Sequence, residues 1–224
     1  MKIYYHPAST TSRPLMLFAA EQGLDAQLQI VDLFTGEHLG EAYGDINPNH
    51  LVPTLEDGDF RLTESSAILK YLADKSGSPT YPKDLKERAK VNEMMDWVNT
   101  QLCRDMAYGF IYPQIFPGQK REDPAVQAAT LAWGKERTKG WLKVLDEKLL
   151  GPNKAFLCGD KLTIADYFGA AFVALGDVTR CSLSAYPNVS RWLGNMKKLK
   201  HWKQVNEAID GYAASMKDKA FETI

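Results

Sequence analysis

The stretch Asn47–Leu55, with the sequence NPNHLVPTL, is the most informative part of this 224-residue chain. Pro53 begins an apolar run typical of a β-strand, a position where proline is tolerated. A cis Val52–Pro53 bond, a form found mainly in tight turns, would turn the N–H and C=O of Val52 outward, and such groups require partners. An extended peptide can supply both hydrogen bonds. The stretch therefore predicts an exposed main-chain edge that binds a small peptide.

The segment Thr63–Ile68 predicts a second part of the same site. Glu64 and Ser65 directly precede the apolar periodicity of a predicted helix. A helix N-terminus offers free N–H groups and a positive dipole end, which bind carboxylates, while an acidic side chain suits an ammonium group. We therefore expect Ser65 to hold the carboxylate and Glu64 the ammonium of an amino-acid head group. The alternative is an ordinary N-cap that serves only its own helix.

The composition describes a globular protein without a strongly charged partner. Its 45% apolar residues suffice for a packed core, and its formal net charge of −1 predicts binding neither to nucleic acid nor to an anionic membrane. The cysteines Cys103, Cys158 and Cys181 are widely spaced and form no CxxC pair, which argues against disulfides and against a zinc site. We see neither a signal peptide nor a membrane span. We expect a cytoplasmic protein without a metal.

Breaker residues and hydrophobic periodicity divide the chain into two expected domains. Residues 1–77 show strand and helix signals in the order β-α-β followed by β-β-α, with the first helix at 14–22, which fits a small α/β sandwich of thioredoxin-like order. The strands are expected at residues 2–5, 28–31, 54–57 and 60–62. Residues 78–87 form the expected linker, and residues 88–224 carry only helical periodicity. The second domain is therefore expected to be all helical.

Capping signals mark the helix limits in the second half of the chain. Asp123 precedes a proline, as at a helix N-terminus, and Gly151 is placed to end the helix that follows. Thr163 and Asp166 have the spacing of a capping box, which predicts a buried helix from residue 164 to 175. Tyr186 stands before Pro187 at the expected start of a further helix.

The loop His6–Arg13 carries four consecutive hydroxyl side chains before the first helix. A hydroxyl that donates to a bound thiol favours the thiolate, because a hydrogen bond to the charged form lowers the pKa. Ser12 lies two residues before Pro14 and is the better N-cap of the helix, so we expect Ser9 to be free for this role. Any single hydroxyl here can also serve as a cap alone.

Segments in both halves of the chain resemble those of the cytosolic glutathione transferases. His6–Ser9 is similar to the serine-type catalytic loop of the phi, theta and delta classes, and Gly36–His38 with Asn47–Leu55 to their glutathione loop and cis-proline. Thr63–Ile68 resembles their γ-glutamyl site and Gly159–Asp166 their helical capping motif. The resemblance implies a thioredoxin-like α/β N-terminal domain, an all-α C-terminal domain, and transfer of glutathione to alkyl or aryl electrophiles.

The resemblance also implies which residues contact glutathione, the co-substrate. They are Ser9, His38, His50, Leu51, Val52, Pro53, Glu64 and Ser65. Ser9 would donate to the sulfur, Val52 would pair with the cysteinyl unit, and the two histidines would face the glycyl end. Tyr5 is the rival of Ser9, because tyrosine-type classes place their catalytic phenol near the end of this strand. Ser66 stands where delta-type members commonly carry an arginine, so one charged clamp is missing or is supplied elsewhere.

The second substrate is expected to be a small hydrophobic electrophile. The residues expected to line its pocket are Arg104, Tyr108, Tyr112 and Phe116. Tyr108 and Tyr112 are four residues apart and share a helix face, although an aromatic stripe also suits a core. The resemblance further implies a homodimer with the Glu64 region near its interface.

Two other functions stay open. A glutathione-dependent reductase, peroxidase or dehalogenase would use the same fold, although a reductase ordinarily has a cysteine where Ser9 stands. A non-catalytic glutathione-binding module is the other alternative, since a fold does not fix a function.

Overall fold

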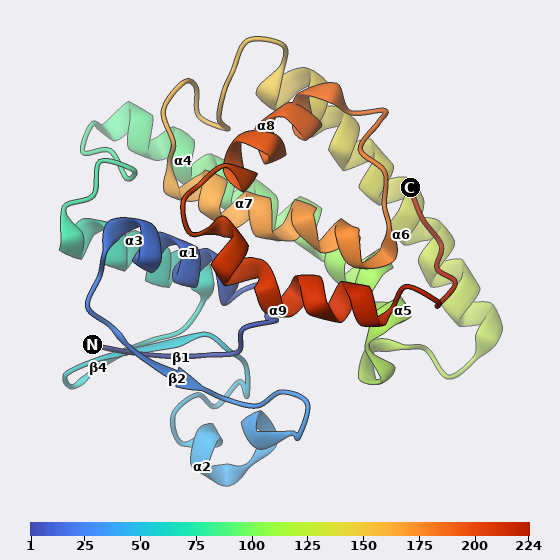
Figure 1. Cartoon of the computed structure of the whole chain (residues 1–224), viewed down its shortest axis with the longest axis horizontal. Coiled ribbons are helices and arrows are strands. Elements are labelled where there is room, and N and C mark those ends of the chain that lie inside the picture. The colour runs from blue at the N-terminus through green and yellow to red at the C-terminus, as the bar shows by residue number, and fades with distance from the viewer.

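The computed structural model describes all 224 residues, and a four-stranded sheet forms its N-terminal part (Figure 1). The strands are β1 (Lys2–Tyr5), β2 (Gln27–Ile30), β3 (Thr54–Asp57) and β4 (Phe60–Leu62). Their order is β2-β1-β3-β4, in which β1 pairs parallel with β2 and antiparallel with β3. All four expected strands are confirmed, and β2 begins one residue earlier than expected.

Helices cover both faces of the sheet (Figure 1). They are α1 (Arg13–Gln22), η1 (Glu37–Leu39), α2 (Glu41–Gly44) and α3 (Ser65–Ser76). Successive strand residues face opposite sides, so Ile3 belongs to the main core, which also holds residues of α1 and α3. Its neighbour Tyr4 packs with Val31, Tyr43 and Val52 in a small core on the side of α2. This second core supports the loop that leads into Pro53.

The rest of the chain is helical, as expected. Its helices are α4 (Leu85–Trp97), η2 (Val98–Ile111), α5 (Tyr112–Ile115), η3 (Pro117–Gln119), α6 (Pro124–Val144), η4 (Leu145–Leu150), α7 (Ile164–Ala174), η5 (Leu175–Thr179), α8 (Pro187–Lys197) and α9 (Trp202–Ser215). The segments η2 and η4 continue α4 and α6 with π-type hydrogen bonds. No helix is both long enough and apolar enough to cross a membrane.

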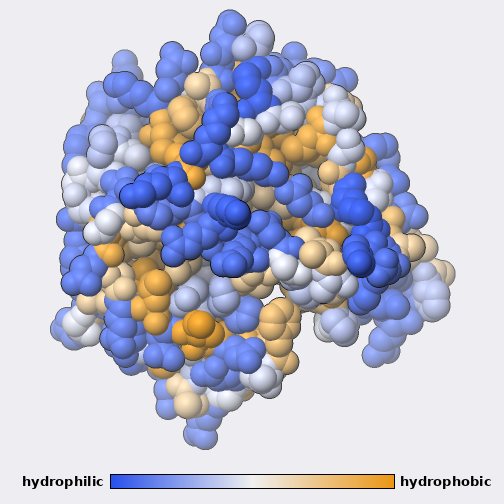
Figure 2. Space-filling view, in the orientation of Figure 1, coloured by the Kyte–Doolittle hydropathy of each residue, from blue (hydrophilic) through white to orange (hydrophobic).

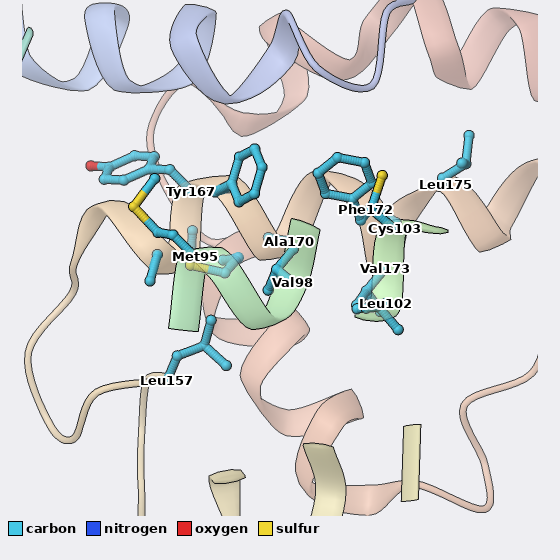
Figure 3. Close-up of a cluster of buried hydrophobic side chains, with 14 of the residues drawn as sticks. Met95, Val98, Leu102, Cys103, Leu157, Tyr167, Ala170, Phe172, Val173 and Leu175 are labelled. Carbon is cyan, nitrogen blue, oxygen red and sulfur yellow. The ribbon is translucent and has the colours of Figure 1, made fainter. Parts of the chain in front are cut away.

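Helix α7 is buried along its whole length at the centre of the helical part. Figure 3 shows Ala170 and Phe172 among side chains from α4 and η2, including Met95 and Val98. The Asp166 carboxylate accepts hydrogen bonds from the N–H of Leu157, the N–H and hydroxyl of Thr163 and Nε1–H of Trp192, at 2.7 to 2.9 Å. Burial raises the pKa of this carboxyl. The expected pairing of residues 163 and 166 is thus confirmed, and it also fixes neighbouring segments.

The other capping signals are confirmed as well. The Asp123 carboxylate accepts hydrogen bonds from the N–H groups of Ala125 and Val126 at the start of α6. Pro187 is the first residue of α8. The helical segment that ends at Leu150 stops at Gly151, whose φ of +59° suits a glycine. These local signals predict helix ends correctly because each residue either pairs with a free main-chain group there or lacks the N–H that would need a partner.

Candidate active site

Two adjoining cavities lie between the sheet part and the helical part of the protein. The larger one has a volume of about 380 Å³, and the smaller one of about 130 Å³. Thr11, Leu51, Val52 and Tyr108 line both of them, so these residues mark the junction. Figure 2 shows the surface hollowed between the segment that carries α2 and the segment that carries α5. A ligand can therefore lie in one cavity and present a group to the other.

The smaller cavity contains the start of α3. Pro53, Glu64 and Ser65 line it. Glu64 has a φ of +64°, an unusual value for a residue other than glycine, and neither Glu64 nor Ser65 caps the helix with its side chain. Glu64 is exposed and makes no ion pair, while the first main-chain N–H groups of α3 have no partner. The simple N-cap alternative is therefore wrong, and an exposed acid stands beside an open helix N-terminus.

Val52 offers one free main-chain group and one that is shared. The Val52–Pro53 bond is cis, as expected, and the N–H of Val52 has no partner in the protein. Its C=O accepts a hydrogen bond from the Thr11 hydroxyl at 2.9 Å, so the expectation that both groups are unpaired is wrong for the carbonyl. A carbonyl oxygen has two lone pairs, and one stays available for a ligand. Val52 can therefore still pair with an extended peptide through both its N–H and its C=O.

The hydroxyl loop differs from the expected arrangement. Ser12 does not cap α1 with its side chain, which is buried and 3.5 Å from the N–H of His6. Instead the Ser9 oxygen accepts a hydrogen bond from the N–H of Ser12 at 3.2 Å and lies 3.1 Å from the Thr11 hydroxyl. Ser9 is thus not free of protein partners. It still lines the larger cavity, whereas Tyr5 packs against the main core and lines neither cavity.

The two candidate histidines occupy different positions. His38 lines the larger cavity, and its Nδ1 is buried without a hydrogen-bond partner. His50 lines neither cavity. Its Nδ1 lies 2.8 Å from the His38 carbonyl oxygen, and its ring packs so closely on Gly44 that a Cβ there would lie 2.8 Å from Cε1. The His50 side chain therefore positions the loop that carries His38, and its expected contact with a ligand stays a prediction.

Aromatic side chains form a continuous wall of the larger cavity. Ring-centroid distances are 5.0 Å from Tyr108 to Tyr112 and 5.1 Å from Tyr112 to Phe116. The wall continues with near-parallel stacking from Phe116 to Tyr212 at 6.3 Å and from Tyr212 to Phe34 at 6.1 Å. Phe34 comes from the loop after β2 and Tyr212 from α9, so segments far apart in the sequence complete this wall.

Arg104 does not belong to that wall. Its guanidinium binds the buried carboxylate of Asp105, which also accepts hydrogen bonds from Arg137 and from Nε1–H of Trp141. Arg104 lines neither cavity. The expected place of Arg104 in the substrate pocket is therefore wrong, because a carboxylate next to it in the sequence holds its side chain against α6.

Three further residues near the site are not marked by the sequence. Phe34 and Tyr212 look like ordinary loop and helix residues, and their contact depends on the tertiary structure. Arg13 is only 2% exposed, and its guanidinium donates to Asn206 and to the Ala171 carbonyl. Burial lowers its pKa to about 10, so the side chain stays charged at neutral pH. A charged residue so deeply buried is uncommon and nothing in the local sequence predicts it.

His6 is a fourth residue of the site that the sequence does not single out as functional. It lines the larger cavity and stands edge-on to Phe34 with ring centroids 5.0 Å apart. Its Nδ1 accepts a hydrogen bond from the N–H of Ala8 at 3.2 Å, and burial lowers its pKa. The ring is therefore neutral and carries its proton on Nε2.

Comparison with known proteins agrees with this geometry. The glutathione S-transferase N-terminal domain family matches residues 8–75, and the C-terminal domain family matches residues 119–200. Glutathione S-transferase theta-1 of Homo sapiens is 39% identical over 170 residues, which cover 74% of this chain and 69% of that protein. The chain belongs to the glutathione S-transferase family.

Solved structures give the same result for the fold. Human glutathione S-transferase T1-1 in its apo form superimposes with a TM-score of 0.81 at 32% identity, over 95% of this chain and 90% of that one. Human glutathione transferase theta-2, solved with glutathione and an unknown ligand, has a TM-score of 0.85 at 27% identity, over 100% and 93%. The thioredoxin-like domain followed by an all-helical domain is confirmed, and so is the assignment as a glutathione transferase.

Proposed function

We propose that this transferase uses the Ser9 hydroxyl to stabilise the thiolate of bound glutathione, which then attacks a small hydrophobic electrophile. The observation that carries the proposal is the junction of the two cavities. A cleft suited to a zwitterionic peptide meets an aromatic cavity next to Ser9 and Val52. Cytosolic location, homodimer formation and a role in detoxification are further parts of the proposal, which the family resemblance supports.

Glutathione is placed in the smaller cavity by its polar groups. Glu64 takes the γ-glutamyl ammonium, and Ser65 with the N-terminus of α3 takes the neighbouring carboxylate, because charge-assisted hydrogen bonds are strong. The free N–H of Val52 and the second lone pair of its carbonyl pair with the cysteinyl unit. His38 faces the glycyl end. This arrangement directs the sulfur toward the junction and the larger cavity.

The chemical gain from Ser9 is limited in size. A thiol with a pKa of about 8.5 is only about 3% ionised at pH 7, and lowering that pKa by about 2 units raises the ionised fraction about 25-fold. Since nucleophilicity falls with thiol pKa, the net gain in rate is roughly threefold. Positioning the sulfur against the electrophile contributes more, because orientation can remove about 7–11 kcal/mol from a barrier.

The electrophile occupies the larger cavity, against the aromatic wall from Tyr108 to Phe34. A volume of about 380 Å³ with mostly apolar lining suits a small hydrophobic molecule. The sulfur forms a bond to the electrophilic carbon, and the leaving group departs with its electron pair or the electrophile accepts addition. Dehalogenation of an alkyl halide follows the same steps.

A redox function is the second candidate. Ser9 occupies the position where a reductase would carry a thiol, so any peroxidase or reductase activity would have to use glutathione itself as the thiol. The three cysteines are free, and Cys103, which lines the smaller cavity, has its pKa raised to about 12 by burial. A thiol so hard to ionise is a poor nucleophile. These features favour conjugation.

The proposal is tested by retention on immobilised glutathione followed by a conjugation assay with a chromogenic aryl halide. Retention with glutathione-dependent turnover supports it. Retention without turnover of aryl or alkyl halides identifies a binding module, and reduction of a peroxide without conjugation identifies the redox function. Size-exclusion chromatography with light scattering tests the homodimer.

A further inference from the structure

The Thr11 hydroxyl lies at the junction of the two cavities and contacts two groups of the proposed site. Its oxygen is 2.9 Å from the Val52 carbonyl oxygen and 3.1 Å from the Ser9 oxygen. A carbonyl oxygen only accepts, so Thr11 donates its proton to Val52. A hydroxyl has one proton, and therefore the hydrogen bond between Ser9 and Thr11 is donated by Ser9.

The proton of Ser9 is thus already engaged in this structure. The Ser9 oxygen accepts a hydrogen bond from the N–H of Ser12 at 3.2 Å and gives its own proton to Thr11. The result is a directed chain of hydroxyl groups from Ser9 through Thr11 to the Val52 carbonyl. The proton that a glutathione thiolate would require points to Thr11 instead.

We propose that Thr11 is a positioning residue that competes with the glutathione thiolate for the Ser9 proton and so limits how strongly Ser9 stabilises that thiolate. The inference rests on the proposed role of Ser9. When the thiol ionises, its proton passes to solvent, Ser9 keeps its own proton, and the Ser9 hydroxyl turns from Thr11 to the sulfur. The hydrogen bond from Ser9 to Thr11 is lost when the hydrogen bond from Ser9 to the sulfur is formed.

Competition of this kind tunes the nucleophile. A thiolate that is stabilised less strongly has a higher basicity and reacts faster once it is formed. Thr11 meanwhile keeps its own hydrogen bond to Val52, so the peptide-binding edge stays in place in both states. The side chain therefore links the position of the edge to the strength of the thiolate contact.

Ultraviolet titration of thiolate absorbance in the protein–glutathione complex tests the inference. Thr11→Val removes the competing acceptor, and we expect the ionisation constant of the bound thiol to rise about two- to tenfold, the range set by one hydrogen bond. Thr11→Ser keeps the hydroxyl and should restore the parent value. In a Ser9→Ala background there is no proton to compete for, so Thr11→Val should have no effect on the constant.

The inference would be overturned if the pKa of the bound thiol in Thr11→Val were unchanged or higher. Loss of a merely structural contact would leave that pKa unchanged or raise it. An equal effect in the Ser9→Ala background would overturn it too. Thr11→Ala repeats the test without a branched side chain, with melting temperatures as the check on folding. A Ser9→Ala change that leaves the thiol pKa unaltered in an otherwise parent protein contradicts the proposed role of Ser9 itself, which separates the two failures.

Discussion

Gly134 and Gly109 bring two long helical segments into direct main-chain contact. A Cβ on residue 134 would lie 2.2 Å from the carbonyl oxygen of Gly109 and 2.5 Å from its carbonyl carbon. Real Cβ atoms do not approach main-chain atoms so closely. The contact joins α6 to η2, the segment that carries Tyr108 and part of the cavity wall, so these glycines determine where that wall stands.

Gly134→Ala should destabilise the protein, because the clash is with backbone and cannot be relieved by a side-chain rotation. Overpacking of this kind lowers the free energy of unfolding by about 1–3 kcal/mol. Gly140 in the same helix provides a matched control, since a Cβ there meets no atom within 4 Å. Gly140→Ala should raise the stability by about 0.5–1 kcal/mol through helix propensity. Urea unfolding of both variants measures the difference, and equal effects would refute the close approach.

Ser9→Ala should raise the pKa of bound glutathione by about 1–2 units, which corresponds to one hydrogen bond to a charged group. Turnover at pH 7 should fall about threefold or more, and the loss should shrink at higher pH, where the thiol ionises without help. The dissociation constant of glutathione should change little. Ser190, which is exposed on α8, supplies the control substitution Ser190→Ala. A pH profile that does not move in Ser9→Ala would show that another group stabilises the sulfur.

Phe34→Ala should weaken the binding of the electrophile and spare that of glutathione. Phe34 is 65% exposed in total, yet its ring stacks on Tyr212 and lines the larger cavity. We expect KM for an aryl electrophile to rise several-fold while KM for glutathione changes little. Trp133→Ala removes an aromatic side chain of similar exposure that lines neither cavity, and it should leave both constants near the parent values.

Acidification should lower the stability of the folded protein through protonation of His6. Burial lowers the pKa of this side chain below its ordinary value of 6.5, so the unfolded chain takes up the proton at a higher pH than the folded protein does. The stability present above pH 6.5 is therefore lost as the pH falls through the lowered folded pKa. His6→Asn keeps an acceptor for the N–H of Ala8 and removes the titration. Melting temperatures from pH 7.5 to 5 should decline less steeply in this variant, and parallel curves would exclude His6 as the source.

The sequence predicts the elements of this protein better than the contacts between side chains. The four strands, the starts of α6 and α8, the helix end at Gly151 and the pairing of Thr163 with Asp166 follow from local rules of turn and cap formation, and these rules act within a few residues. The position of the Ser12 side chain could not be predicted. Its buried oxygen accepts from the N–H of His6, and its own N–H donates to the Ser9 oxygen.

The corrected and missed residues depend on partners that are distant in the sequence. Arg104 binds the Asp105 carboxylate, which also accepts hydrogen bonds from Arg137 and Trp141 of α6, and no helix periodicity on one segment reveals that cluster. Arg13 likewise meets Asn206 nearly two hundred positions later. Residue spacing identifies the buried face of a helix. Which segment packs against that face depends on the fold of the whole protein.

The stacking of Phe34 on Tyr212 has a consequence for how such a protein can diversify. The proposed glutathione contacts all come from the first third of the chain, whereas most of the aromatic wall is contributed by later helices, and this aromatic contact joins the two. Recombination between homologous genes can then exchange the later helices and create new selectivity without rebuilding the sulfur chemistry. Hybrid proteins that preserve this stacked pair should retain a continuous aromatic wall, so the pair can guide the choice of parents for such hybrids.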